Sequence, residues 1–395
     1  MFELEEVATP ETGSTVIKVV GVGGAGGNAV EHMIREGVGG VEFICCNTDA
    51  QALKKSSAHV KLQLGPGLGA GGKPEKAREL AVLDRVRIAE ALTGAHMVFI
   101  TAGMGGGTGT GAGPIVAEVA RELGILTVAV VTKPFEYEGK RKRLAEEGVA
   151  ELASHVDSLI IILNEKLEEV LGDEVSMLEA FQAADNVLRN AVGGIAEIIN
   201  VPGLVNVDFE DVRTVMGEMG KAMMGSAVAA GVDRARVAAE EAVASPLLEG
   251  IELSGARGVL VNITASTTLG LKEYKEVMKT IRQYTAPEAT VICGAVFDES
   301  MEDQLRVTVV ATGLGGVVAR EAVKPRMSVV ETVGLRTGTD NLPVYDTGIG
   351  QVQIDLSSVT SSARGSAPRN AQADAMAASG VDKYDIPAFL RRQSD

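Results

Sequence analysis

The segment 105–111 reads Gly-Gly-Gly-Thr-Gly-Thr-Gly and carries no side chain larger than threonine. Bare backbone N–H groups and threonine hydroxyls are the chemistry that it offers, and such groups can close around a phosphate. The apolar run 97–100 before it predicts a buried parallel strand, and the apolar stretch 115–123 after it predicts a helix with Pro114 in its first turn. A helix N-terminus adds partial positive charge, so we interpret the segment as a phosphate loop and not as a flexible linker.

Two further glycine-rich segments accompany this loop. Residues 21–26 fit the pattern G-x-G-x-x-G, with Glu42 or Asp49 about 20 residues later, and alone they favour an NAD-dependent oxidoreductase. A pyrophosphate needs only one helix N-terminus, however, whereas the loop at 105–111 supplies a second and residues 69–72 a third glycine-rich turn. Three such loops predict a triphosphate surrounded on several sides. Since no G-x-x-x-x-G-K-[ST] motif occurs, Mg²⁺ is expected to neutralise the phosphates.

A carboxylate lies on the apolar stripe of a predicted long helix. The pattern Ser176-x-x-Glu179 is a capping box that starts this helix, which runs to about Asn200. Asp185 falls four residues after Phe181, on the same face. Burying an unpaired carboxylate costs several kcal/mol, so Asp185 is either solvated at the edge of the stripe beside a core Phe181, or it has a donor partner.

Asn206, Asp208 and Asp211 form another polar constellation, at the predicted start of a helix. Carboxylates at that position can cap the helix by accepting hydrogen bonds from its free N–H groups. They could instead polarise a water molecule or hold the water ligands of Mg²⁺. The spacing favours the cap.

The elements that must position these residues alternate between strands and helices. Strands are predicted at 16–22, 41–47, from 97, at 126–131 and at 158–163, with helices at 28–36, 74–92 and 115–123. This order predicts an α/β fold: a doubly wound, mostly parallel sheet.

A second, smaller α+β domain with a mixed sheet follows the long helix. Helices are predicted at 211–224, 234–244 and 271–284, and strands at 259–264, 290–297 and 305–312. The predicted organisation is a disordered extension (1–15), a nucleotide-binding domain (16–175), a central helix (176–200), an α+β domain (201–318), a disordered linker (319–381) and a C-terminal partner-binding peptide (382–395).

Composition limits the classes of function. The chain has 395 residues with 53 Asp and Glu against 37 Lys and Arg, and a net charge of −16 repels a nucleic-acid backbone. The basic cluster 140–143 is too small for a duplex groove, so no nucleic-acid partner is expected. The three cysteines and four histidines show no metal-ligand spacing, so we expect no protein-ligated metal and a reduced cytoplasmic location. No apolar run approaches about 20 residues, which argues against membrane insertion.

Taken together, the motifs resemble those of the tubulin/FtsZ family of GTPases, from about residue 16 to 393. The segments that carry the resemblance are Gly21-Val22-Gly23-Gly24, Asn47-Thr48-Asp49, the glycine loop 105–111, Thr132-Lys133-Pro134-Phe135, Asn206-Val207-Asp208-Phe209 and the tail Asp385-Ile386-Pro387-Ala388-Phe389-Leu390.

The resemblance implies a site for GTP or GDP. The residues implied around the phosphates and sugar are Gly23, Gly24, Ala25, Gly26, Gly27, Asn28, Ala70, Gly71, Gly106, Gly107, Thr108 and Gly109, with Glu138 at the ribose. Phe181 would stack on guanine, Asp185 would accept from its N1–H and N2 amine, and Asn164 would contact the base.

The resemblance also implies that Asn206, Asp208 and Asp211 act on the GTP of the next subunit in a head-to-tail homopolymer, so hydrolysis should rise on assembly. It further implies Mg²⁺ bound mainly through phosphates and water, a cytoplasmic ring at the midcell division site, division-site regulators, and membrane-anchoring partners such as FtsA or ZipA at 382–395.

Two positions depart from the family pattern. The family usually has arginine four residues after the glutamate at 138, but this chain has Lys142, between Arg141 and Arg143. Which of the three contacts GTP stays open. The loop before Gly69 is also a few residues shorter than in most relatives. Two alternatives stay open as well: the NAD-dependent oxidoreductase, and a nucleotide-binding structural protein without turnover.

Overall fold

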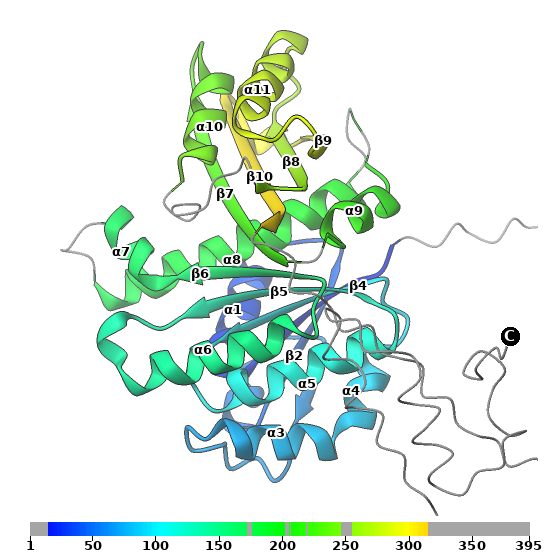
Figure 1. Cartoon of the computed structure of the whole chain (residues 1–395), viewed down its shortest axis with the longest axis vertical. Coiled ribbons are helices and arrows are strands. Elements are labelled where there is room, and N and C mark those ends of the chain that lie inside the picture. The colour runs from blue at the N-terminus through cyan, green and yellow to red at the C-terminus, as the bar shows by residue number, and fades with distance from the viewer. Residues whose placement is uncertain are drawn as a thin grey trace, which may run out of the picture. The chain divides into compact units, whose positions relative to one another are not determined.

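The computed structural model describes residues 15–171, 176–201, 205, 207–218, 220–245 and 255–314 (Figure 1). The predicted linker (319–381), the predicted terminal peptide (382–395), Asn206 and all of the predicted N-terminal extension but Thr15 lie outside these residues. Among the helices of the described part, none is long and apolar enough to cross a membrane.

One sheet organises the described residues. Its strand order is β3-β2-β1-β4-β5-β6-β7-β10-β8-β9. The strands are β1 (Ile17–Val22), β2 (Val41–Asn47), β3 (Val60–Gln63), β4 (Met97–Gly103), β5 (Leu126–Lys133), β6 (Ser158–Leu163), β7 (Gly220–Ala230), β8 (Gly258–Ala265), β9 (Thr290–Phe297) and β10 (Gln304–Leu314). The six strands β1 to β6 all pair in parallel, as the alternation of strands and helices predicts.

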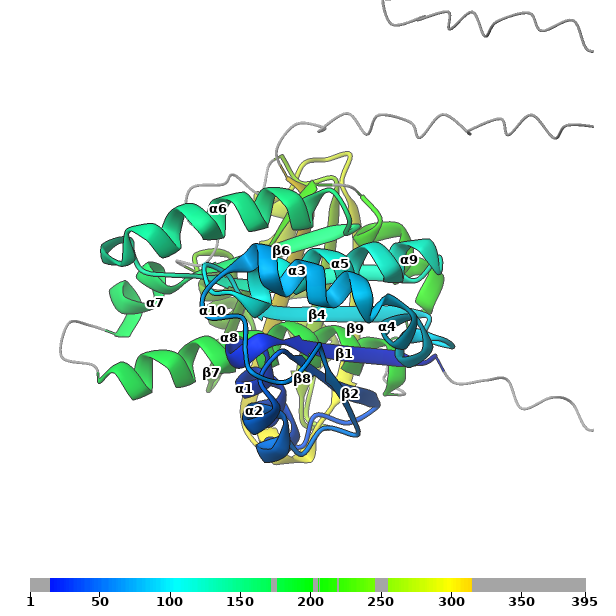
Figure 2. The ribbon, with the colours of Figure 1, turned by 90° about the horizontal axis from the view of Figure 1, so that it is seen from below.

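Helices cover both faces of the parallel part because its strands are apolar on both faces. In β4, Met97 and Phe99 pack toward α1 and α8, whereas Val98 and Ile100 pack toward α5. Figure 2 shows α3, α5 and α6 on one side of the strands and α1, α2 and α8 on the other. The helices here are α1 (Gly23–Arg35), α2 (Ala50–Lys55), α3 (Pro74–Leu83), α4 (Arg85–Leu92), α5 (Thr108–Glu122), α6 (Lys140–Ala153), α7 (Asn164–Leu171) and α8 (Met177–Asn200).

The mixed sheet of the second domain continues the first sheet and does not stand apart from it. A short parallel pairing joins β6 to β7 through Ser158, Leu159 and Ile160. Beyond it β10 is antiparallel to both β7 and β8, and β8 is parallel to β9. The helices of this part are α9 (Phe209–Met216), α10 (Arg234–Val243) and α11 (Leu271–Tyr284), of which α10 and α11 share a separate apolar core with β8 and β10.

Four predicted helices were wrong in part. The helix predicted at 28–36 begins at Gly23, because the first glycine loop itself forms its first turn. The helix predicted at 211–224 ends at Met216, and β7 begins at Gly220, whose φ of 149° is incompatible with a helix. The helix predicted at 74–92 is two helices, because Asp84 turns the chain between them and accepts from the N–H of Gly65 at 2.9 Å. Pro114 lies inside α5 and not in its first turn, because the glycine loop itself forms the first turn from Thr108.

The central helix α8 is tied to the second part of the sheet by a polar cluster. The Glu197 carboxylate accepts from Arg306 Nη2 at 3.1 Å, from Asn262 Nδ2 at 3.3 Å and from Thr264 Oγ1 at 3.4 Å. Asn262 also donates to the Gly194 carbonyl at 3.2 Å. A partly buried charged group is costly to leave without a hydrogen-bond partner. This cluster therefore couples α8 to β8 and β10.

Candidate functional site

Most of the predicted ligand residues meet at one edge of the sheet. Adjacent parallel strands end there in register, with Val22 of β1 opposite Ala102 of β4, and Gly103 of β4 opposite Thr132 of β5. The segments that follow β1, β4, β5 and β6 therefore lie along a single edge. Ligands bind at the carboxyl ends of strands in open α/β sheets, so this edge is the candidate site.

The three glycine loops contact one another at this edge. A β-carbon placed on Gly23 would lie 2.9 Å from the N atom of Gly109, so the first loop packs against the second. A β-carbon on Gly107 would lie 2.9 Å from Cβ of Ala70, so the second packs against the third. Other glycines in the loops face open space, where a β-carbon would meet nothing within 4 Å: Gly24, Gly27, Gly71 and Gly106. The packed glycines shape a cradle, and the open ones leave its backbone accessible.

Close packing also brings two helix N-termini together. Gly23 starts α1 with a φ of 79°, and a β-carbon on Gly109 in the first turn of α5 would lie 2.6 Å from the Gly103 carbonyl oxygen. Gly26 lies against the carbonyl of Thr101, and Ala25 lies against Gly103. Free N–H groups of both helices thus converge, and their combined partial positive charge favours a multiply charged anion.

The turn after β2 completes the cradle, although the sequence reasoning did not include its residues among the ligands. Thr48 Oγ1 and Thr108 Oγ1 are 2.7 Å apart, and the Thr48 carbonyl accepts from Gly69 N at 2.8 Å. A hollow of about 300 Å³ between this turn and α1 is lined by Asn28 and Asp49, among others. The position of Thr48 and Asp49 directly after a parallel strand was a usable signal for them.

The charged residues after β5 are already paired. Glu138 accepts from the Phe135 N–H at 3.1 Å and forms an ion pair with Arg141. Lys142 Nζ lies 2.6 Å from Glu136 Oε1, and this hydrogen bond lowers the pKa of Glu136 below its usual value. A β-carbon on Gly105 would lie 2.6 Å from the Arg141 carbonyl oxygen. The backbone of Arg141 therefore touches the glycine loop.

A second group of predicted ligands lies on α7 and α8, and these two helices contact each other. Asn164 starts α7 directly after β6; its side chain is 8% exposed and its Oδ1 has no hydrogen-bond partner. Phe181 is 50% exposed, so it is an available stacking surface and not a core residue. Burial raises the pKa of Asp185 to about 6, while the positive charge of Arg35 acts in the opposite direction.

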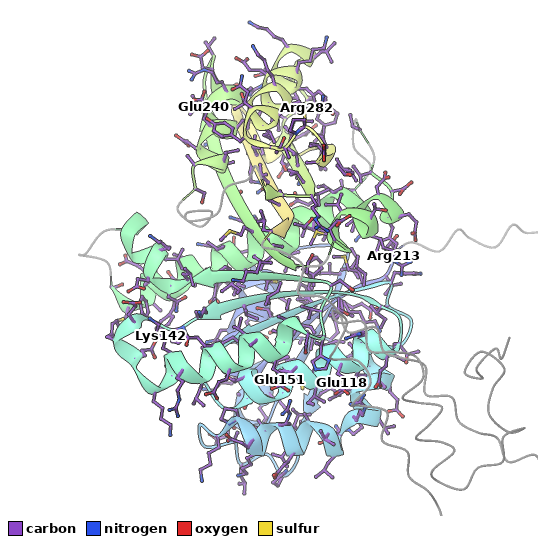
Figure 3. The ribbon with its side chains drawn as sticks, viewed as in Figure 1. Glu118, Lys142, Glu151, Arg213, Glu240 and Arg282 are labelled. Carbon is purple, nitrogen blue, oxygen red and sulfur yellow. The ribbon has the colours of Figure 1, made fainter. Side chains whose placement is uncertain are left out.

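The predicted catalytic carboxylates lie elsewhere, at the opposite edge. Asp208 caps α9 by accepting from the Asp211 N–H at 2.8 Å, as the spacing predicted, and both residues are exposed. Phe209 stacks edge-on against His96, which immediately precedes β4, at 6.0 Å between ring centroids. The glycine loop follows the other end of β4, and a strand of seven residues spans about 20 Å. Figure 3 shows Arg213 of α9 and Lys142 of α6 at opposite ends of the strands.

Comparisons with known proteins cover both parts of the chain. The model of the Tubulin/FtsZ family GTPase domain matches residues 16–172, and that of the FtsZ family C-terminal domain matches residues 220–315. The Cell division protein FtsZ of Pseudomonas aeruginosa is 53% identical over 407 aligned residues, which cover all of both chains. That of Coxiella burnetii is 52% identical over 397 residues, or 99% of each chain.

Solved structures are similar as well. An FtsZ dimer of M. jannaschii superposes with a TM-score of 0.73 at 42% identity, covering 77% of this chain and 89% of that one. CetZ2 from Haloferax volcanii, solved as a GTPγS-bound protofilament, gives a TM-score of 0.66 at 20% identity, covering 76% and 94%. The second similarity shows the fold alone.

The packing of the cradle predicts that Gly109→Ala weakens nucleotide binding. The added methyl group must push α5 away from the carbonyl of Gly103, so the N–H groups of the two helices no longer converge. We expect the affinity for GTP to fall at least about tenfold, as for the loss of one charge-assisted hydrogen bond. Fluorescence titration with a labelled nucleotide measures this.

Gly113→Ala is the matched control, because it makes the same change one turn later in α5, where a β-carbon would meet nothing within 4 Å. It should bind like the wild type and be slightly more stable. Equal affinities of the two variants would contradict the assignment of the cradle.

Proposed function

Because the chain belongs to the Tubulin/FtsZ family of GTPases, we propose that it assembles head-to-tail into filaments and hydrolyses GTP at the junction between two subunits. One observation carries this proposal: the phosphate cradle and the exposed carboxylates of α9 lie at opposite edges of one sheet, about 20 Å apart. No single subunit can bring them together, whereas a neighbour stacked edge to edge can. Such a contact is heterologous and leads to open filaments.

In this proposal each part of GTP has its own element. The first turns of α1 and α5 and the turn at 69–72 hold the phosphates, while Glu138 reaches the ribose. Phe181 stacks on guanine, and Asp185 accepts from N1–H and the N2 amine, which adenine does not offer in that arrangement. The unpartnered Oδ1 of Asn164 supports a contact with the base. For the basic position, Arg141 is favoured over Lys142, because its backbone lies against the glycine loop.

Mg²⁺ fits the site through the nucleotide and not through a protein cage. Among the described residues, no group of three or more His, Cys, Asp or Glu side chains could hold a metal ion. The cradle offers N–H groups, which favour phosphate oxygens but cannot bind a cation. Bound to the phosphates and water, Mg²⁺ would supply the charge neutralisation that a P-loop lysine gives elsewhere.

Catalysis in this proposal belongs to the neighbour's α9. Asp208 and Asp211, with Asn206, would orient the water that attacks the γ-phosphate and accept its proton through the solvent network. The cap formed by Asp208 then has a second consequence, since it fixes the first turn of α9 and with it the direction of Asp211.

Beyond the site, we propose that the filaments form the cytokinetic ring of the bacterial division site. The self-association of FtsZ, as in the M. jannaschii dimer, supports the assembly. Residues 16–175, 176–200 and 201–318 would act as GTP-binding domain, central helix and C-terminal domain. The peptide 382–395 would bind membrane-anchoring proteins such as FtsA or ZipA. The oxidoreductase alternative is not favoured, because the GTPase family matches the domain that carries the glycine loops.

The shared site predicts that Asp211→Ala abolishes turnover without weakening GTP binding. Phosphate release per wild-type subunit should climb with protein concentration, because each new junction completes a site. In Asp211→Ala it should stay flat and lie at least about 100-fold lower at the highest concentration, as expected for the loss of a general base. A phosphate-release assay with 90° light scattering in the same cuvette measures both turnover and assembly.

Glu210→Ala is the matched control, because it removes an adjacent exposed acid from the same helical turn. It should retain the concentration dependence. A flat wild-type profile, or unchanged turnover in Asp211→Ala, would show that the site is complete within one subunit.

The raised pKa of Asp185 predicts that GTP binding weakens in acid. The ionised carboxylate accepts both guanine hydrogen bonds, and with a pKa of about 6 it loses its charge as pH falls through 6. Affinity for GTP should therefore drop between pH 7 and pH 5. Asp185→Asn should bind GTP about 10- to 100-fold more weakly at pH 7 and lose most of this pH dependence.

Gln182→Ala, exposed on the same helix, serves as the control and should keep the wild-type profile. The measurement is a nucleotide titration at five pH values. A pH profile shared by wild type and Asp185→Asn would rule out Asp185 as the titrating group.

A further inference from the structure

A buried histidine links the helix of the phosphate cradle to the helix of the base site. His32 lies near the C-terminal end of α1 and is 6% exposed. Its Nε2 is 2.7 Å from Oδ1 of Asn186, the residue after Asp185 in α8, and its Nδ1 is 2.5 Å from Nη2 of Arg35. The link therefore runs from α1 to the residue next to the proposed guanine ligand.

The partners of His32 fix its protonation state. An arginine side chain can only donate hydrogen bonds, so Nδ1 of His32 must accept and carries no proton. Nε2 then holds the single ring proton and donates it to Oδ1 of Asn186. All donors point in one direction, from Arg35 through a neutral His32 to Asn186, and each ring nitrogen is satisfied.

The same cluster acts on the charge of Asp185. Burial disfavours its ionised form, and the positive charge of Arg35 partly offsets that effect. Only an ionised carboxylate accepts both hydrogen bonds of the guanine edge. Arg35 is anchored mainly by His32, because its contact with the Glu36 carboxylate is long, at 3.9 Å, and its side chain is 65% exposed.

A displacement of α8 relative to α1 would change the contacts with both the phosphates and the base of the nucleotide. Helix α1 has 13 residues, about 20 Å, with the cradle glycines in its first turns and His32 in its last. A rigid helix transmits the position of His32 to Gly23 and Gly24. The distance between phosphate and base contacts is thus set in part by the bond between His32 and Asn186.

We propose that His32 and Arg35 are positioning residues for guanine recognition, holding α8 against α1 so that Asp185 meets the N1–H and N2 amine of the base. This inference rests on the proposed role of Asp185. In this proposal, His32 and Arg35 contribute to the selectivity for guanine over other bases although they do not contact the nucleotide.

The test compares the affinities for GTP and ITP, since ITP lacks the N2 amine and retains N1–H. Equilibrium titrations use full-length wild type, His32→Leu, His32→Gln and Arg35→Met. Wild type should prefer GTP. In His32→Leu, which removes both bonds, the affinity for GTP should fall about tenfold and that for ITP less, so the preference shrinks. His32→Gln can both donate and accept, and it should recover most of the preference.

Arg35→Met keeps the inference testable if His32→Leu does not fold, because the exposed Arg35 side chain contributes little to the core. It should reduce the preference for GTP several-fold at an unchanged unfolding midpoint. If both variants lose affinity for GTP and ITP equally, or retain the wild-type preference, the positioning role is wrong. Equal binding of GTP and ITP by the wild type would instead overturn the guanine role of Asp185, and this inference with it.

Discussion

A close backbone approach at the sheet edge sets the conditions for the rest of the site. Gly109 at the start of α5 lies so near the Gly103 carbonyl and the first turn of α1 that no side chain fits between them. Because of this contact, two helix N-termini point to the same place, and the N–H groups between them are accessible to a ligand. The resulting positive potential is made from backbone dipoles. In the proposed function the cradle needs no lysine of its own, because a cation that accompanies the nucleotide would balance the phosphate charge.

The length of the strands decides how far the cradle lies from the exposed carboxylates of α9. Every strand that ends at the cradle begins at the other edge, where α9 presents Asp208 and Asp211 to solvent. In a parallel sheet these edges stay apart by the strand length, whatever the loops do. Helix α8 spans the same molecule, with Asp185 near one end and the Glu197 cluster near the other. In the proposed function, nucleotide recognition, the C-terminal sheet and assembly thus share one rigid element, which would give them a physical basis for coupling.

Much of this arrangement could be predicted from local patterns. The strands at 41–47, 158–163 and 290–297 and the helix at 271–284 have the predicted bounds, because their apolar runs end at clear turn residues. The glycine loops could be predicted as phosphate-binding segments, because residues with little or no side chain offer mainly backbone N–H groups to a ligand. Errors arose where a tertiary contact overrode the local pattern. Helix α5 starts inside its glycine loop. Strand β7 contains residues that are spaced as in a helix, because β6 and β10 pair with it on either side. The His32 link could not be predicted, because its partners meet only through folding. Thr48 was missed although its position directly after a parallel strand pointed to the site.

The central claim is that each active site is built from two molecules, and mixing two defective proteins tests it most directly. At a GTP concentration that fills the cradle of Asp211→Ala but not the weakened cradle of Gly109→Ala, the first variant binds GTP but offers no carboxylate at position 211. The second is largely empty but has intact carboxylates on α9. If sites are shared, a junction between the two kinds of subunit is complete, and the equimolar mixture should release phosphate several-fold faster than the sum of the separate proteins at the same concentrations. A mixture no faster than that sum, in filaments shown by labelling to contain both variants, would contradict a shared site.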